Sequence, residues 1–304
     1  MKYTYYITDV FTNQAFNGAQ VAVFPDAVGL DKLQMSLIAR ELNLTETVFL
    51  SKMENQENHF VMKMFSPHGE IDTAGHPIIA AAYTLGSCFR LSITDNHTPV
   101  VFHQNAGEIE ASVTFKDNKP SFIQYKRTVS PIVDYFTPTE TELSSFLGID
   151  AAYIDNKKYS TRLVSCGTPY LVVPTFYYKT LREAKFDFSA WSQSIAPQTA
   201  AQEILLVSPK TPSQDSDFAI RLVGPNIAYN DDPPVGSAIP TLAAFLCSFD
   251  HMQKGTYTFS VQRGDEKTRR SIINLEMDHK GEDNLNLRVG GEAVMVSEGQ
   301  FTFS

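Results

Sequence analysis

The chain of 304 residues contains only three cysteines, Cys88, Cys166 and Cys247. They show no C-x-x-C spacing and their number is odd, so the sequence indicates neither a disulfide framework nor a zinc site. This usage is typical of a reducing compartment, and we expect a cytoplasmic protein. The seven histidines include no H-x-H or H-x-x-x-H pair. The sequence therefore predicts no metal site.

Long apolar runs and positive charge are also scarce. No uninterrupted apolar stretch approaches the roughly 18 residues that a membrane helix needs, and residues 1–11 lack the pattern of a secretory signal. The 25 Lys and Arg against 34 Asp and Glu give a net charge of −9, which opposes binding to a phosphate backbone. The glycine-rich loops that bind nucleotides are absent. We expect no membrane partner, no nucleic-acid partner and no cofactor.

The composition, with 43% hydrophobic and 12% aromatic residues, is that of a globular protein. Its length is about twice that of a typical domain of roughly 150 residues, which favours two domains. Strand-like patterns cover 3–10, 19–24, 47–51 and 59–65, with Asn17-Gly18 as the turn between the first two. A capping box of Asp31 and Gln34 predicts a helix over 32–42.

One pattern occurs twice. The blocks that begin at Phe60 and Phe218 each contain an alternating strand, a proline, an acidic loop, a glycine and a helix rich in small residues. The matching glycines, Gly75 and Gly236, are 236 − 75 = 161 positions apart, about half the chain. We therefore predict two pseudo-equivalent α+β domains. The first covers 1–130 and is completed by a last strand at about 294–304, and the second covers 131–293.

Two further local signals lie in the second half of the chain. The segment Thr137-Pro138-Thr139-Glu140 is interpreted as a helix start with a proline at the first helical position and a capping box. Residues 256–304 are strand-like, with predicted turns at Gly264, Lys280-Gly281 and Gly290-Gly291.

The candidate site consists of two helix starts and a base. If Gly75-His76 and Gly236-Ser237 begin helices that face each other, their N–H groups can hold a carboxylate and stabilise charge on a deprotonated neighbouring carbon. Glu46 or Asp232 would be the base, and His76 could donate or accept a proton. Each residue alone is more often a loop carboxylate, a turn former or a cap.

Several ordered motifs carry a family resemblance: Asp9-Val-Phe-Thr12, Val21-Ala-Val-Phe24, Leu44-Thr-Glu-Thr-Val-Phe49, Phe65-Ser-Pro67, Cys166-Gly-Thr-Pro169, Asp232-Pro233 and Gly236-Ser-Ala238. Together they resemble the PhzF-like isomerases of phenazine biosynthesis, whose fold is similar to that of diaminopimelate epimerase. The resemblance implies a mostly antiparallel or mixed sheet wrapped around a central helix in each domain. It also implies a homodimer and no cofactor.

The resemblance assigns roles to particular residues. Glu46 matches the family's acid/base glutamate, and His76, Asp232 and Ser237 match its supporting polar residues. The remaining positions that we expect to contact a small carboxylate substrate are Gly75, Gly236, Thr168 and Gly18.

The chain departs from the family pattern near two of these positions. The family usually has Gly-Asn-Pro where this chain has Gly18-Ala19-Gln20. It usually has Asp-Pro-Ala-Thr-Gly-Ser where this chain has Asp232-Pro-Pro-Val-Gly-Ser237. The loss of polar groups at Ala19, Pro234 and Val235 indicates a bulkier or less polar ligand.

Racemases of this fold place a cysteine before each helix-start glycine, and this chain has Ala74 and Val235 there. We therefore predict a cofactor-independent isomerase in which Glu46 moves a proton, and with it a double bond, next to a carboxylate. Burial should raise the pKa of Glu46, and the cysteines should be dispensable. The alternatives are an epimerase in which Asp232 or His76 opposes Glu46, and a catalytically silent small-molecule-binding protein.

Overall fold

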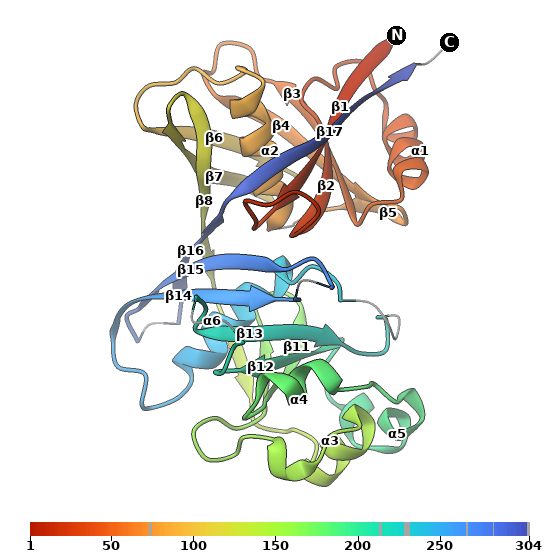
Figure 1. The fold of residues 1–304 in the computed structure, drawn as a ribbon, viewed down its shortest axis with the longest axis vertical. Helices are drawn as coiled ribbons and strands as arrows, with labels where there is room; N and C mark the ends of the chain where they lie inside the picture. The colour runs from red at the N-terminus through yellow and green to blue at the C-terminus, as the bar shows by residue number, and fades with distance from the viewer. Residues whose placement is uncertain (73–74, 213–214, 228–231, 266, 282, 303–304) are drawn as a thin grey trace. The chain divides into compact units, whose positions relative to one another are not determined.

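The computed structural model describes residues 1–72, 75–212, 215–227, 232–265, 267–281 and 283–302 (Figure 1). The chain forms two compact units. The first contains Met1–Arg127, Arg269–Ser271 and Arg288–Ser304, and the second contains Thr128–Thr268 and Ile272–Leu287. The chain returns to the first unit briefly at Arg269–Ser271 and then from Arg288, ahead of position 294, because the strand β16 (Leu285–Gly291) pairs with β8 (Lys119–Val129).

The first unit is built from most of the N-terminal elements and the last strand. These are β1 (Lys2–Val10), β2 (Ala19–Phe24), α1 (Lys32–Leu42), β3 (Glu46–Lys52), β4 (His59–Ser66), β5 (Gly69–Ile71), α2 (His76–Ser87), β6 (His97–Gln104), β7 (Gly107–Lys116), β8 (Lys119–Val129) and β17 (Ala293–Thr302).

The sheet of the first unit is mixed. β1 pairs antiparallel with β17 and β2, whereas β2 and β3 are parallel. β4 pairs antiparallel with β3 and parallel with β6, and β6, β7 and β8 form an antiparallel meander. The sheet wraps around α2, which packs against β1, β2, β3, β7 and β17. This is the predicted central helix.

The sequence of each helix in the first unit explains its place. α2 is apolar on all sides and buried along nearly its whole length, as expected for a core helix. It has Pro77 in its first turn, where a missing N–H costs nothing. α1 begins at the predicted capping box of Asp31 and Gln34 and ends at Asn43 in the left-handed conformation. Its buried side packs on Phe24, Phe49 and Phe65 on the outer face of the sheet.

The second unit contains the remaining elements. They are β9 (Ile132–Asp134), α3 (Glu140–Leu147), β10 (Arg162–Ser165), β11 (Pro169–Pro174), α4 (Tyr178–Glu183), α5 (Phe188–Gln193), β12 (Glu203–Ser208), β13 (Phe218–Val223), α6 (Ile239–Cys247), β14 (Gly255–Arg263), β15 (Ser271–His279) and β16 (Leu285–Gly291), with 3₁₀ turns at Ala151–Tyr153, Ala196–Gln198 and Gly236–Ala238.

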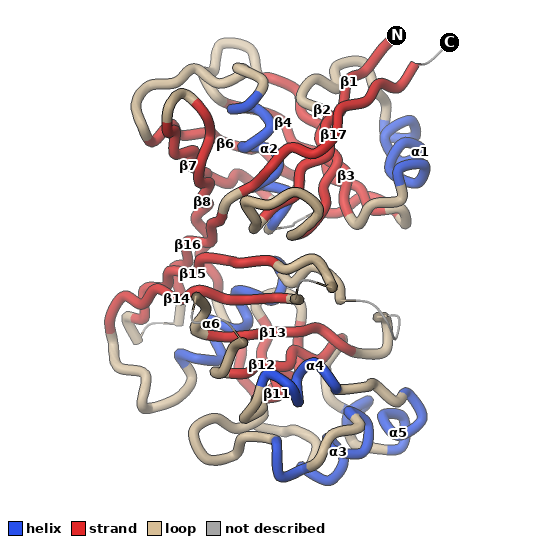
Figure 2. The backbone as a smooth tube through the Cα atoms, viewed as in Figure 1, coloured by secondary structure: helices blue, strands red, loops and turns tan. Residues whose placement is uncertain are grey.

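The order of strand pairings in the first unit recurs in the second. In the second unit, β11 and β12 are parallel, β12 and β13 antiparallel, and β13 and β14 parallel. The first unit has the same order: β2 and β3 are parallel, β3 and β4 antiparallel, and β4 and β6 parallel. α6 is the buried helix of this unit and packs against β10 and β11. Figure 2 shows α3, α4 and α5 grouped together in this unit, where Phe146 and Trp191 anchor a separate apolar cluster. No helix in the described part of the chain has both the length and the apolar character needed to cross a membrane.

Two local predictions were wrong. The capping box of α3 consists of Thr139 and Glu142, so Pro138 precedes the cap and does not occupy the first helical position. Gly290-Gly291 is not a turn but the end of β16. A Cβ atom at Gly290 would lie 2.7 Å from the carbonyl oxygen of Ile123 in β8. Glycine is needed there for close strand approach rather than for chain reversal.

Candidate active site

Glu46 is the first residue of β3 and follows closely on the end of α1. The left-handed residue Asn43 ends the helix, and the chain enters a strand in which Glu46 lies opposite Val21 of β2. The side chain of Glu46 is 16% exposed. The turn and the strand register together hold a mostly buried carboxylate at the start of β3, which lies between β2 and β4.

His76 begins α2, directly after its N-cap residue Gly75. Its side chain is 5% exposed, and its Nε2 lies 2.6 Å from Oε2 of Glu46. The carboxylate accepts this hydrogen bond, so the ring carries a proton on Nε2. The structure thus brings together two of the three predicted catalytic residues, which are 30 positions apart in the chain.

The pKa of Glu46 is lowered from its ordinary value of 4.5. Burial is the largest single influence and acts to raise it, but the charge and hydrogen bond of His76, with a hydrogen bond from Thr45, outweigh burial. The predicted raised pKa was therefore wrong, because the sequence did not reveal the contact with His76. Glu46 is a carboxylate at neutral pH and is ready to accept a proton.

Gly18 is held by its backbone at the start of β2. Its N–H donates to the Arg270 carbonyl, and its own carbonyl accepts from Nε of Arg269. Its φ is +69°, and a Cβ atom would lie 2.1 Å from the Val10 carbonyl oxygen. Arg269 also donates to the buried carboxylate of Asp9 at 2.5 Å. Both backbone groups of Gly18, its N–H and its carbonyl, therefore already have hydrogen-bond partners within the first unit.

Asp232 lies in the second unit in a buried ion pair. Arg182 donates to one of its carboxylate oxygens, and Nε of Arg263 lies 3.5 Å from the other. The exposed fractions of the Asp232 and Arg182 side chains are 5% and 17%. Arg182 also contacts Thr268 and Asp265. The Asp232 carboxylate is thus engaged by two arginine side chains.

Gly236 and Ser237 do not begin the α-helix, contrary to the prediction. They form a 3₁₀ turn, and α6 begins three residues after Gly236, at Ile239. Pro240 explains the shift, because proline favours the first turn of a helix. The exposed Ser237 hydroxyl lies 3.1 Å from the hydroxyl of Tyr170. Thr168 lies in the turn between β10 and β11.

Sequence reasoning missed the partners of these residues. Arg182 and Arg263 bind Asp232, Tyr170 contacts Ser237, and Thr45 supports Glu46. Arg182 lies in a short helix without a recognisable motif, so no signal pointed to it. Tyr170 directly follows the Cys166–Pro169 motif and could have been included on that ground.

All three cysteines are distant from Glu46 in the sequence. Cys88 caps the far end of α2, and Cys247 ends α6. Cys166 donates to the Pro240 carbonyl at 3.5 Å, near the start of α6. Val235 is buried, and Ala74 lies outside the described residues.

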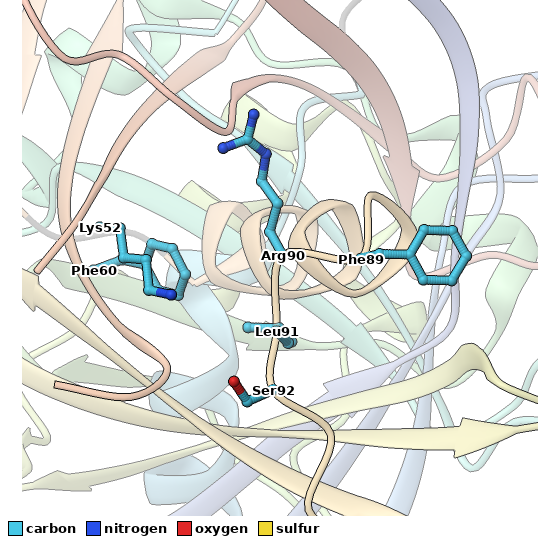
Figure 3. Close-up of a pocket in the computed structure, with 6 residues that line it drawn as sticks. All are labelled: Lys52, Phe60, Phe89, Arg90, Leu91 and Ser92. Carbon is cyan, nitrogen blue, oxygen red and sulfur yellow. The ribbon is translucent and has the colours of Figure 1, made fainter.

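A pocket elsewhere in the first unit contains none of these residues. Figure 3 shows this cavity of about 270 Å³, which is lined by Lys52, Phe60, Phe89, Arg90, Leu91 and Ser92. We therefore do not assign the active site to it. Among the described residues, no group of three or more His, Cys, Asp or Glu is placed to hold a metal ion.

Comparison with solved structures identifies the fold. A PhzF-family phenazine biosynthesis protein from Bacillus anthracis aligns over 100% of both chains with a TM-score of 0.85 at 20% identity. A hydroxyproline epimerase from Agrobacterium vitis aligns over 99% of this chain and 91% of its own, with a TM-score of 0.63 at 10% identity. The fold is thus the α+β architecture shared by PhzF proteins and racemases.

Sequence comparison then identifies the family. Residues 8–299 match the family described as "Phenazine biosynthesis-like protein". An uncharacterized isomerase of Mesorhizobium japonicum is 29% identical over 97% of both chains. The trans-2,3-dihydro-3-hydroxyanthranilate isomerase of Pseudomonas chlororaphis is 41% identical over 97% of this chain and 98% of its own. The chain belongs to the phenazine biosynthesis-like (PhzF) family and is an enzyme of the isomerase class.

Proposed function

We propose that this isomerase moves a proton between two carbons of a small carboxylate, with Glu46 as the acid/base group and no cofactor. The observation that carries the proposal is the 2.6 Å contact between the buried Glu46 carboxylate and His76. A general base must be ionised and held in position, and the contact with His76 supports both for Glu46.

The reaction balances with one carboxyl group. The Glu46 carboxylate removes a proton from a carbon near the substrate carboxylate, and the bonding electrons pass into a conjugated enolate. Glu46, now protonated, returns the proton to a different carbon, and the double bond moves. His76 holds the Glu46 side chain in place between the two steps.

The substrate-binding roles of Gly75, Gly236, Ser237, Thr168 and Gly18 remain predictions, as do that of Asp232 and the homodimer. The 41% identical relative is named for its action on trans-2,3-dihydro-3-hydroxyanthranilate, so this cyclic carboxylate is the first compound to test. Ala19, Pro234 and Val235 favour a less polar analogue as the better substrate.

Two arguments favour the isomerase over an epimerase that uses two bases. His76 contacts Glu46 directly, so it lies on the same side of a substrate as Glu46 and cannot serve the opposite face. Asp232 is held by two arginines. Both proposed opposing bases are already engaged by other side chains, which disfavours them for that role.

Conversion of the dihydroanthranilate and its analogues in D₂O, followed by NMR, separates the three candidate functions. The isomerase should yield a product with a moved double bond and a fraction of the original proton retained at the new carbon. Full deuteration of an inverted stereocentre without double-bond movement would instead establish the epimerase. Calorimetric binding without turnover would establish a binding protein.

A further inference from the structure

A pair of histidines that includes none of the candidate site residues joins two neighbouring strands of the first unit. β4 and β6 are parallel, with His59 opposite Val101 and Val61 opposite His103. His59 and His103 therefore project from the same face of the sheet as diagonal neighbours. Nδ1 of His59 lies 3.0 Å from Nε2 of His103.

A carboxylate orients one of these rings. Nδ1 of His103 lies 3.1 Å from Oε1 of Glu108, its partner across the β6–β7 hairpin. An ionised carboxylate only accepts hydrogen bonds, so Nδ1 of His103 carries the proton and Nε2 presents its lone pair to His59. Metal-binding histidines are commonly oriented in this way by a carboxylate on the second ring nitrogen.

The distance between the two nitrogens is close to the distance between two neighbouring ligands of one metal ion. With metal–nitrogen bonds of about 2.1 Å, two nitrogens 3.0 Å apart subtend an angle of roughly 90° at the ion. A tetrahedral ion, with angles of about 109°, would need the nitrogens about 3.4 Å apart. Small ring rotations can also provide this distance, so the preference for Cu²⁺ rests on its tighter binding to nitrogen ligands. Square-planar and tetragonal geometries, which Cu²⁺ and Ni²⁺ adopt with nitrogen ligands, have angles near 90°.

We propose that His59 and His103 bind one divalent transition-metal ion, Cu²⁺ in preference to Zn²⁺, with Glu108 as the orienting carboxylate. The ion replaces the hydrogen bond between the rings, and the His59 proton moves from Nδ1 to Nε2. Small rotations of both rings direct their lone pairs at the ion.

The site is open to solvent. The His103 side chain is 23% exposed, and Val61, on the same face of the sheet, is 38% exposed. The described residues provide no cluster of three potential ligands, so water would complete the coordination. Binding would link β4 to β6 and raise the melting temperature of the protein, because the ion binds the folded chain preferentially.

Titration of the tag-free full chain with CuCl₂ and ZnCl₂ at neutral pH, followed by calorimetry, tests this proposal. We expect one Cu²⁺ per chain, bound more tightly than Zn²⁺, with a Cu²⁺ electron paramagnetic resonance spectrum showing two coordinated nitrogens. His59→Gln and His103→Gln should each abolish the site. Glu108→Gln should weaken binding by about 10- to 100-fold.

His97→Gln is the matched control. His97 is an exposed histidine on the same strand as His103, and its ring contacts Thr114, so this change should leave binding unaltered. Circular dichroism confirms that each variant is folded. Failure of the wild-type chain to bind Cu²⁺ at one site, or unchanged binding in folded His59→Gln or His103→Gln, would overturn the proposal.

Discussion

The two units place a glutamate at the same point of the same strand pattern. Glu46 begins β3, which is parallel to the preceding β2 and antiparallel to the following β4. Glu203 begins β12, which is likewise parallel to β11 and antiparallel to β13. In each unit, the matched glycine, Gly75 or Gly236, comes after the last of these strands and shortly before the buried helix.

The surroundings of the two glutamates differ. Burial raises the pKa of Glu203, against hydrogen bonds from Asn226, whereas His76 lowers that of Glu46. The residue after the matched glycine is His76 in the first unit and Ser237 in the second, and Ser237 contacts Tyr170. The strand frame therefore sets where a carboxyl lies, whereas its neighbours set the direction of its pKa shift.

The largest expected effect separates the two glutamates. Glu46→Gln should lower kcat by about 10²- to 10⁴-fold with little change in KM, because the amide cannot accept a proton. Glu203→Gln, the counterpart in the second unit, should leave kcat nearly unchanged. Steady-state kinetics on the substrate identified by NMR provide the measurement. Equal losses in the two variants would mean that the units share the chemistry.

The ion pair of Asp232 should dominate the stability of the second unit. Asp232→Asn removes the nearer charged partner of the largely buried Arg182 and leaves it, among the described residues, only Asp265 at 3.6 Å, and we expect a loss of about 3 kcal/mol in the free energy of unfolding. Glu183→Gln on the same helix is the control. Its exposed pair with Lys179 should contribute less than about 1 kcal/mol.

Urea unfolding measures the free energy of unfolding of Asp232→Asn and Glu183→Gln. Asp232→Asn should also lower kcat less than Glu46→Gln does, if Asp232 only orients the substrate. A stability loss no greater than that of Glu183→Gln would show that the buried pair is not a structural anchor.

The smallest expected effect is a shift in pH dependence. The wild-type pKa of Glu46 is lowered from 4.5, so the acidic limb of kcat/KM that this group causes should lie below pH 4.5. The stabilisation of the folded protein by the pairing of Glu46 with His76 should be lost as the pH falls through the same range. His76→Leu leaves burial unopposed by His76, and the limb should move to higher pH. His76→Gln, which keeps a hydrogen-bond donor, should move it less.

Ser237→Ala is the counterpart control for this shift. Because Ser237 contacts Tyr170 and not Glu46, its removal should leave the position of the acidic limb where it is in the wild type. An unmoved limb in His76→Leu would show that His76 does not set the pKa of Glu46.

Much of the fold could be predicted because its signals are local. The capping box of Asp31 and Gln34 predicted α1, and the repeated block around Pro67 and Pro225 predicted the two-unit α+β organisation. The start of α6 was misplaced by three residues, since Gly236 resembles Gly75 but Pro240 sets the first helical turn. Family motifs led to Glu46 and His76 but contained no information on their contact.

The sequence by itself predicted the strand pattern and the buried helices, because these depend on residue periodicity and short motifs, and its family resemblance pointed to Glu46 as the proposed acid/base carboxyl. Only the tertiary structure decided the charge state of that carboxyl. The contacts of Glu46 with His76, Asp232 with Arg182 and His59 with His103 join residues 30, 50 and 44 positions apart. Strand register and helix packing bring these residues together, and at Glu46 the balance between burial and the neighbouring His76 then sets the direction of the pKa shift.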